Sequence, residues 1–292
     1  MVELDNDRVS YFEVLKRASS FLTKNDESAF AAEWLMRERL DWTKTDLIKN
    51  YHEKMPKEEK EQFKKDLQQF TEGQPMQQII GHDWFLDRKF ILTADTLIPR
   101  PETEEWMDRL LKRLPDRPLK VLDIGTGTGV LAISQKLERP EDEVTAIDIS
   151  SEAIKVAKKN ADNLGARINF IESDLFEELT DHSFDLILSN PPYISRDELD
   201  LMDDSVLEHE PKEALFAGNN GLAIYEAIAQ QLAGYLEEDY IIALEIGYAQ
   251  GKAVTELFQE KFPKAKIELW KDFNHLDRLV FIRQQDVERA CG

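Results

Sequence analysis

The stretch VLDIGTGTGVLAIS, Val121–Ser134, joins an apolar run to an amphipathic segment through three closely spaced glycines. The run KVLDI (120–124) has the length and composition of a buried strand, and the residues after Gly129 have those of a helix. Glycines between a strand and a helix permit a tight turn and let a ligand approach the backbone closely. This stretch therefore predicts a strand, a ligand-binding loop and a helix within an α/β domain.

Apolar runs with the length of strands recur along the chain and alternate with segments of helical periodicity. The helical segments include 151–165 and 222–236. Apolar strands that alternate with amphipathic helices are typical of α/β domains with a largely parallel sheet. We therefore predict a seven-stranded, mostly parallel, Rossmann-like sheet within residues 101–292. Its strands are expected at 120–124, 143–149, 167–173, 184–190, 240–246, 266–270 and 278–282.

Residues 1–72 contain no glycine and carry apolar residues at helical spacing, such as Phe30 and Trp34. A helix is expected to begin near Pro56, in the stretch KMPKEEKEQFKKDLQQF. The sequence predicts a small all-α N-terminal domain over these residues. Its aromatic side chains are expected to form a core, and a partner-binding groove is the alternative.

Residues 73–100 change character, because turn-forming residues separate short apolar stretches. Trp84–Leu86 and Phe90–Leu92 flank the polar residues Asp87–Lys89. Two short apolar runs around a polar turn are typical of a β-hairpin. We predict that residues 73–100 form a linker with a β-hairpin between the helical domain and the α/β domain.

The chain is strongly acidic, with 58 acidic and 37 basic residues and a formal net charge of −21. A surface of this sign repels phosphate backbones, so the charge disfavours direct nucleic-acid binding. It also attracts a basic partner, although acidity that only maintains solubility would give the same composition. We therefore expect no direct nucleic-acid partner.

Three further features bear on the compartment and on metals. The one cysteine, Cys291, cannot form an internal disulfide or a zinc site built on several thiolates. The sequence begins MVELDNDRVS, without a signal peptide, and no stretch approaches the ~20 apolar residues of a membrane span. No histidine pair has the spacing of metal ligands on a helix. We expect a cytoplasmic protein without a membrane partner or a bound metal.

An acidic residue follows the glycine loop at the spacing of a nucleoside site. Asp148 ends the second predicted strand, about 20 residues beyond Gly129, where a carboxylate can accept hydrogen bonds from both ribose hydroxyls. The loop lacks the Gly-Lys-Ser/Thr of phosphate loops, and its GxGxG spacing differs from the GxGxxG of dinucleotide sites. Asp123 would repel a pyrophosphate, but it suits the cationic end of S-adenosylmethionine.

We therefore predict an S-adenosylmethionine site at this loop, and an ordinary glycine-rich turn is the alternative. A cofactor of this kind brings an activated methyl group, so the residues beside the loop are candidates for a methyl acceptor site. The expected cofactor-binding residues are Asp123, Gly125, Thr126, Gly127, Thr128, Gly129 and Asp148.

The stretch FDLILSNPPYIS (184–195) carries the most specific motif of the chain. Asn190 to Tyr193 follow a predicted buried strand, so we expect them at the same sheet edge as the glycine loop. This pattern suits methyl transfer to a planar amide nitrogen, whose N–H bonds must be held while its electron density faces the methyl carbon. The side-chain oxygen of Asn190 and the carbonyl of Pro191 can accept those two hydrogen bonds.

The remaining residues of this motif are expected to fix the backbone and to cover the acceptor group. Pro191 and Pro192 have no N–H and a fixed φ, which sets the direction of the carbonyl. Tyr193 offers a flat face to a planar group. We predict that Asn190, Pro191 and Tyr193 are catalytic and that Asn190–Tyr193 bind the substrate, with neither a base nor a metal required. A strand-terminating turn is the alternative.

With these motifs the chain resembles the peptide chain release factor glutamine methyltransferases, from about Pro75 to Ile282. The glycine loop and NPPY are shared with adenine and other N-methyltransferases, whereas IPRPETE and EPKEALFAG are much narrower and decide the family. The matching stretches are QPMQQIIGH (74–82), TLIPRPETE (96–104), DIGTGTG (123–129), AIDIS (146–150), SDLF (173–176), NPPYI (190–194) and EPKEALFAGNNGL (210–222).

The resemblance implies methylation of the glutamine in the Gly-Gly-Gln motif of release factors, with S-adenosylmethionine as the methyl donor. It implies a seven-stranded methyltransferase fold, whose N-terminal helical domain recognises the substrate. Phe176 would cover the adenine, in a position where many relatives carry tryptophan, and Asn190 would contact both the cofactor and the acceptor glutamine. Arg100 and Glu102–Glu104 would shape the cleft, or they simply begin a helix. We expect a monomer that acts on release factors.

Two other functions are compatible with parts of this pattern. NPPY can hold the exocyclic amino group of a flipped base, so an adenine N6 nucleic-acid methyltransferase is the alternative enzyme. The acidic charge and the absence of a basic stripe disfavour it. A non-catalytic sensor of the cofactor would keep the glycine loop, but it would have no use for an intact NPPY motif.

Overall fold

The computed structural model describes residues 9–180, 183–195, 197, 199, 207 and 209–284 of the chain. Cys291 lies outside the described residues. The chain divides into two compact units, and each is described by itself. The first unit is Met1–His82 with Asp203–His209, and the second is Asp83–Met202 with Glu210–Gly292.

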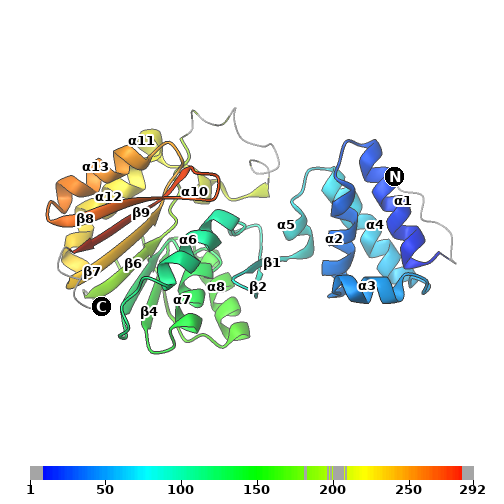
Figure 1. Cartoon of the computed structure of the whole chain (residues 1–292), viewed down its shortest axis with the longest axis horizontal. Coiled ribbons are helices and arrows are strands. Elements are labelled where there is room, and N and C mark those ends of the chain that lie inside the picture. The colour runs from blue at the N-terminus through cyan, green and yellow to red at the C-terminus, as the bar shows by residue number, and fades with distance from the viewer. Residues whose placement is uncertain are drawn as a thin grey trace. The chain divides into compact units, whose positions relative to one another are not determined.

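Helices α1 to α5 belong to the first unit (Figure 1). Ser10 caps α1 in a capping box with Glu13, which satisfies two backbone N–H groups at the helix start. The helix expected near Pro56 begins there, since Pro56 is the N-cap of α4. The all-α prediction for this region is confirmed, whereas its role and its boundary at residue 72 stay predictions. The bounds are α1 (Tyr11–Lys24), α2 (Ala29–Leu40), α3 (Lys44–Asn50), α4 (Lys57–Thr71) and α5 (Met76–Ile80).

The apolar faces of these helices pack into a core of their own. Trp34 packs against this core as expected, whereas Phe30 is 61% exposed and does not belong to it. Arg39 donates two hydrogen bonds of 2.8 Å to the buried Asp66, so the acid inside the bundle is paired. The unit therefore has the apolar and polar contacts of an independent core.

The expected hairpin consists of β1 (His82–Phe85) and β2 (Arg88–Ile91). Its turn is Leu86–Asp87, with φ of 46° and 58°. Positive φ at both central residues is typical of a two-residue hairpin turn. The turn therefore has two residues, whereas the three residues Asp87–Lys89 were predicted. Asn160 fixes the second strand, because its side chain accepts from the N–H of Ile91 at 2.7 Å and donates to the carbonyl of Ile91 at 3.1 Å.

A seven-stranded sheet forms the centre of the second unit, in the order β5-β4-β3-β6-β7-β9-β8. The pairs β5–β4, β4–β3, β3–β6 and β6–β7 are parallel, and only β9 runs antiparallel to its neighbours β7 and β8. The predicted seven-stranded, mostly parallel sheet is confirmed. The bounds are β3 (Lys120–Ile124), β4 (Glu143–Asp148), β5 (Asn169–Glu172), β6 (Phe184–Ser189), β7 (Leu236–Glu245), β8 (Ala265–Lys271) and β9 (Asp277–Gln284).

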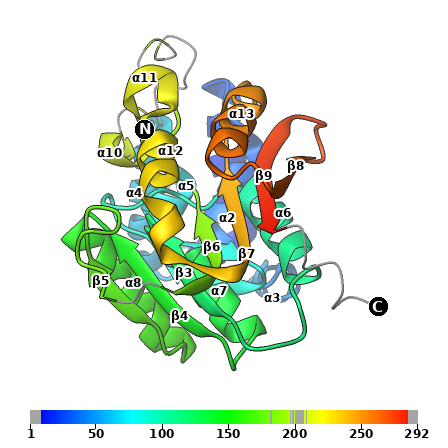
Figure 2. The ribbon, with the colours of Figure 1, turned by 90° about the vertical axis from the view of Figure 1, so that its left-hand side faces the viewer.

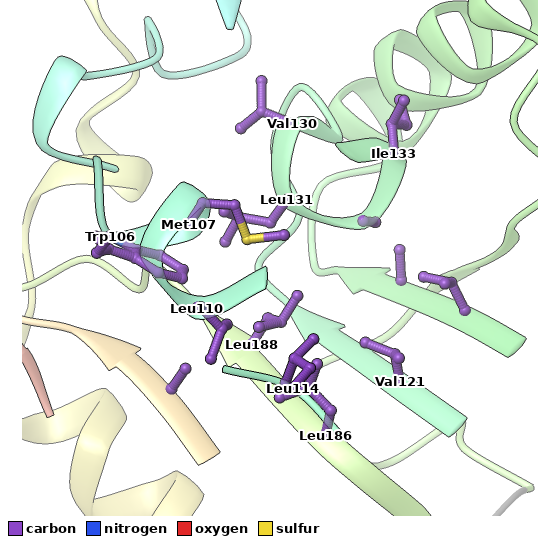
Figure 3. Close-up of a cluster of buried hydrophobic side chains, with 14 of the residues drawn as sticks. Trp106, Met107, Leu110, Leu114, Val121, Val130, Leu131, Ile133, Leu186 and Leu188 are labelled. Carbon is purple, nitrogen blue, oxygen red and sulfur yellow. The ribbon is translucent and has the colours of Figure 1, made fainter. Parts of the chain in front are cut away.

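Helices cover both faces of the sheet (Figure 2). Residues of α6 (Pro101–Leu111), α7 (Val130–Glu138) and α8 (Ser151–Leu164) share one apolar cluster with alternate strand residues such as Val121. Figure 3 shows Met107 of α6 beside Leu131 of α7 in this cluster. On the other face, residues of α12 (Ala223–Gln231) and α13 (Gly251–Lys261) pack with strand residues such as Leu122. Val121 and Leu122 thus point to opposite layers, as a strand requires.

The parallel strands end at a common edge of the sheet. Ile124, Asp148, Ser189 and Glu245 are the last residues of β3, β4, β6 and β7. Ligands of open α/β sheets bind outside these carboxyl ends, where the connecting loops meet. Across the described residues, no helix is long and apolar enough to cross a membrane.

Candidate active site

A cavity of about 720 Å³ opens at the carboxyl edge of the sheet. Its wall includes the glycine loop Gly125–Thr128, the end of β4 at Asp148 and the motif residues Asn190–Pro192. The size lies in the range of small-ligand sites. The expectation that the glycine loop and NPPY share one sheet edge is therefore confirmed.

The glycine loop offers bare backbone to this cavity. Gly125 and Gly127 have φ of 70° and 55°, and a Cβ on either would meet no atom within 4 Å. Both positions therefore need glycine for their conformation, and both leave space for a ligand against the main chain. Thr126 and Thr128 also line the cavity, although each is almost fully buried. These four predicted cofactor residues of the loop thus lie on its wall.

Gly129 is positioned differently from the other two glycines. It has a φ of 84°, and a Cβ there would lie 2.8 Å from Ile133 Cδ1 and 3.2 Å from Ala157 Cβ. Of the described residues that line the cavity, Gly129 is not one. Gly129 therefore has a packing role, because the close approach of α7 and α8 leaves no room for a side chain, and its predicted contact with the cofactor stays a prediction.

Asp148 lies at the end of β4 and lines the cavity as predicted. Its carboxylate accepts from the N–H of Gly127 and from the N–H of Ser150, both at 2.9 Å. Burial raises the pKa of Asp148, and these backbone donors oppose the rise. The same carboxylate therefore holds the glycine loop and borders the cavity.

Asp123 lies beneath the loop and not on the cavity wall. It is fully buried, and its Oδ2 accepts from Thr126 Oγ1 at 2.7 Å and from the N–H of Ala132 at 3.2 Å. Its Oδ1 has no hydrogen-bond partner among the described residues. Direct contact with a cofactor was predicted for Asp123, whereas its hydrogen bonds in the structure support the loop.

Replacing Asp123 by asparagine is expected to remove a pH dependence of stability. Burial raises the pKa of Asp123 to about 7, above the ~3.9 of an unfolded chain, so the native state retains a proton that the unfolded state releases. The contribution of this group to the free energy of unfolding is complete below pH ~4 and is lost as the pH rises through about 7.

The variant should therefore gain stability relative to the wild type between about pH 4 and 8, by up to ~4 kcal/mol. Urea unfolding at a series of pH values measures this difference. A difference that stays constant over that range would show that Asp123 does not hold its proton in the native state.

Phe176 does not face the cavity. It is 1% exposed, and its ring stacks on Tyr235 with the centroids 4.5 Å apart. The preceding residue, Leu175, has a φ of 49° and lines the cavity. The turn at Leu175 therefore sends the aromatic ring into the core, and the predicted adenine contact of Phe176 is not supported.

The NPPY motif divides between the cavity and the core. Asn190, Pro191 and Pro192 line the cavity, whereas Tyr193 is not among the described residues of its wall. The half-buried ring of Tyr193 packs with the apolar cluster of α12 and α13, close to Gly247. The predicted role of Tyr193 as a flat face for the acceptor is therefore not supported in this arrangement.

The stretch EPKEALFAGNNGL holds the NPPY motif in place. Ile194 accepts from the N–H of Ala217 and donates its own N–H to the carbonyl of Leu215, both at 3.0 Å. The carbonyl of Tyr193 accepts from Gln250 Nε2 at 2.8 Å, and Gly221 packs directly against it. Two stretches that were singled out separately in the sequence thus form one structural element.

Replacing Gly221 by alanine is expected to destabilise this element. Gly221 has a φ of 81°, and a Cβ would lie 2.1 Å from the carbonyl oxygen of Tyr193. The strained backbone and the overlap together should lower the free energy of unfolding by at least ~2 kcal/mol. Thermal or urea unfolding measures the loss. Gly234→Ala is the matched control, since a Cβ there meets no atom within 4 Å; equal effects of both variants would contradict this packing.

Arg100 joins the IPRPETE stretch to the same element. Its guanidinium donates to Glu210 Oε1 at 2.6 Å, and the other carboxylate oxygen accepts from the N–H of Ile98 at 3.3 Å. Arg100 lines the cavity, so it shapes the cleft as the family resemblance implied. Arg100 is also the N-cap of α6, with Pro101 as the first helical residue. The helix start is therefore confirmed. Arg100 and Thr103 line the cavity, whereas Glu102 and Glu104 are not among the described residues of its wall, and their role in the cleft stays a prediction.

Sequence reasoning missed several residues of the site. Ile149 and Leu175 are apolar wall residues of the cavity. They lie within the matching stretches AIDIS and SDLF, but neither residue was predicted to bind a ligand. Behind Asn190, the side-chain NH2 donates to Thr103 Oγ1 at 3.3 Å, and the Thr103 hydroxyl donates to Glu245 Oε2 at 2.6 Å. Thr103 lies inside RPETE, which gave a signal, whereas Glu245 ends a strand without any motif.

Comparisons with known proteins find two matching family models and several similar relatives. Residues 107–218 match the family model described as methyltransferase small domain, and residues 13–81 match the PrmC N-terminal domain. The release factor glutamine methyltransferase of Enterococcus faecalis is 47% identical over 270 residues, which cover 92% of this chain and 98% of that protein. The protein of the same name from Staphylococcus aureus is 40% identical over 274 residues, which cover 93% and 98%.

A solved structure shows the same fold. The catalytic domain of hMettl16 in complex with the MAT2A 3'UTR hairpin 1 superposes with a TM-score of 0.50 at 17% identity, over 68% of this chain and 75% of that chain. At this identity the likeness concerns the fold alone. The sheet, the glycine loop and the cavity define an S-adenosylmethionine-dependent methyltransferase. At 47% identity over nearly the whole length of both chains, this chain belongs to the family of release factor glutamine methyltransferases.

Proposed function

We propose that this methyltransferase transfers the methyl group of S-adenosylmethionine to the side-chain nitrogen of the glutamine in the Gly-Gly-Gln motif of peptide chain release factors. The observation that carries the proposal is that Asn190 and Pro191 line the same cavity as Gly125 and Gly127. A cofactor on the glycines and an acceptor on the NPP residues would therefore face each other. The helical unit, residues 1–72 in the proposed division, would recognise the release factor.

The residues present fit S-adenosylmethionine. Gly125 and Gly127 leave open space above their backbone, and Asp148 presents a carboxylate to the same cavity. These groups suit the amino-acid end and the ribose of the cofactor, and the apolar Ile149 and Leu175 suit its adenine. When bound, the cofactor supplies an electrophilic methyl group on a sulfonium.

The acceptor side needs two hydrogen-bond acceptors and a fixed direction. An amide nitrogen is a poor nucleophile, because its lone pair is delocalised into the carbonyl. The Asn190 side-chain oxygen and the Pro191 carbonyl would accept the two N–H bonds and hold the nitrogen in line with the methyl group. Positioning of this kind contributes several kcal/mol, of the ~7–11 available to ideal proximity. The proton is lost after the transfer, so no base is required in the motif.

A labelled-methyl assay tests the proposal directly. The enzyme is incubated with S-adenosylmethionine carrying a labelled methyl group and with a release factor, and the label in the protein is counted. We expect label in the intact release factor and none when the glutamine of its Gly-Gly-Gln motif is replaced by alanine. Equal labelling of both release factors would overturn the proposed acceptor.

The proposal includes a monomeric enzyme that needs no nucleic acid. The net charge of −21 supports the absence of a nucleic-acid partner, since a chain of this charge disfavours binding to duplex and single-stranded nucleic acid alike. Light scattering of the enzyme alone should give the mass of one chain. Treatment of both proteins with nuclease should leave the methylation rate unchanged, and a loss of rate would speak for a nucleic-acid component.

A further inference from the structure

A chain of buried hydrogen bonds leads from helix α6 to Asn190. The indole N–H of Trp106 and the hydroxyl of Thr103 both donate to Glu245 Oε2, at 2.7 Å and 2.6 Å. Asn190 Nδ2 lies 3.3 Å from the Thr103 oxygen. Thr103, Trp106 and Glu245 are at most 3% exposed, and Thr103 also borders the cavity that Asn190 lines.

The donors and acceptors of this network have a fixed direction. An indole nitrogen can only donate, so the N–H of Trp106 makes Glu245 Oε2 an acceptor. The hydroxyl of Thr103 has a single hydrogen, which is given to the same carboxylate oxygen. Toward Asn190, Thr103 therefore has only lone pairs to offer, and Asn190 must turn its NH2 group to it.

The orientation of the Asn190 carboxamide decides what the cavity presents to an acceptor. An amide side chain can rotate by about half a turn and exchange its oxygen with its NH2 group. With the NH2 group bound to Thr103, the oxygen Oδ1 is left for the cavity that Asn190 lines. In the reverse orientation the NH2 group would meet the N–H bonds of a glutamine amide, and two donors would face each other.

We propose that Thr103 and Glu245 are positioning residues, which act through Asn190 by fixing its carboxamide with Oδ1 toward the acceptor. The inference rests on the proposed function, since it assigns the oriented oxygen to the glutamine amide. It also assigns the RPETE stretch a positioning role next to the reaction centre. Trp106 lies on the next turn of α6 and donates the second hydrogen bond to the carboxylate of Glu245.

The test compares two substitutions of Thr103 that differ in one hydroxyl. Thr103→Val keeps the shape of the side chain and removes the hydroxyl, whereas Thr103→Ser keeps the hydroxyl. We expect Thr103→Val to lower kcat for release factor methylation by at least ~10-fold, because it removes a buried hydrogen bond and unpairs its neighbours. The Kd of S-adenosylmethionine, measured by calorimetry, should stay within ~2-fold, and Thr103→Ser should restore kcat to within ~3-fold of the wild type.

A second pair of variants guards against a folding defect. Glu245→Gln keeps an oxygen that can accept from Thr103 and Trp106, whereas Glu245→Leu removes every acceptor. The glutamine variant is expected to keep a larger kcat than the leucine variant at equal cofactor occupancy, with the melting temperature recorded for each protein.

Two results would overturn the inference. One is a Thr103→Val enzyme with the kcat of the wild type, and the other is a Thr103→Ser enzyme as impaired as Thr103→Val. A wild-type enzyme that binds the cofactor but transfers no methyl to the release factor would instead count against the proposed function. The wild-type control thus separates the two failures.

Discussion

Asn190→Ala is expected to lower kcat for release factor methylation by at least ~100-fold and to leave the Kd of S-adenosylmethionine within ~3-fold. The substitution removes the oxygen that would hold one N–H of the acceptor amide. It keeps the backbone carbonyl of Pro191 and the glycine loop, which lie on the same cavity. Steady-state transfer of a labelled methyl group measures kcat, and calorimetry measures the affinity for the cofactor.

Asn163→Ala is the matched control for this variant, because Asn163 is an exposed residue of α8. It should behave as the wild type in both measurements. If Asn190→Ala retained kcat within ~3-fold, the assigned role of the side-chain oxygen would be wrong, since a group essential for orientation contributes more than that.

Asp148→Ala is expected to have the second large effect, this time on the cofactor. The variant loses a carboxylate that lines the cavity and that accepts from the N–H groups of Gly127 and Ser150. Charge-assisted hydrogen bonds to a ribose contribute ~1.5–3 kcal/mol, and the glycine loop loses a support at the same time. We therefore expect the Kd of S-adenosylmethionine to rise at least ~10-fold.

The control for this variant is Asp162→Ala, which removes an exposed carboxylate from α8. It changes the net charge by the same amount, so it corrects for long-range electrostatics. Calorimetry with both variants decides the matter. If Asp148→Ala bound S-adenosylmethionine with the Kd of the wild type, the proposed contact between Asp148 and the ribose would be wrong.

The fold could largely be predicted from the sequence, because buried parallel strands are continuous apolar runs. Each of the seven expected runs is a strand, and the loop after Ile124 is the expected glycine turn. The start of β7 was missed, since the polar residues Glu237–Asp239 at its beginning do not resemble a buried strand. These three residues belong to β7 because Leu236 still pairs with Phe184 of β6, on the far side of a shift in the β6–β7 register.

The site could be predicted in part, for a physical reason. Residues whose chemistry needs direct contact with a ligand, such as Asn190, Pro191 and Asp148, lie on the cavity wall. Gly129 and Phe176 turn toward the core instead. A glycine or an aromatic residue in a motif can serve packing as well as binding, and the local sequence does not distinguish the two.

The hydrogen bonds that support Asn190 could not be predicted, although the RPETE stretch marked the segment that contains Thr103. Thr103 and Glu245 are far apart in the sequence, and their hydrogen bond arises only because α6 packs beside the end of β7. A glutamate at the end of an apolar strand gives no sign of the partner that it will meet. Such pairs become visible only when the tertiary structure brings the two elements together.

We propose above all that the enzyme methylates one glutamine nitrogen, in the cavity at the carboxyl edge of the sheet. Tandem mass spectrometry of a release factor, after incubation with the enzyme and S-adenosylmethionine, tests it most directly. We predict the mass of one added methyl group on the glutamine of the Gly-Gly-Gln peptide, absent when the enzyme is the Asn190→Ala variant. A methyl group on another residue, or on the same glutamine at the same rate with that variant, would contradict the claim.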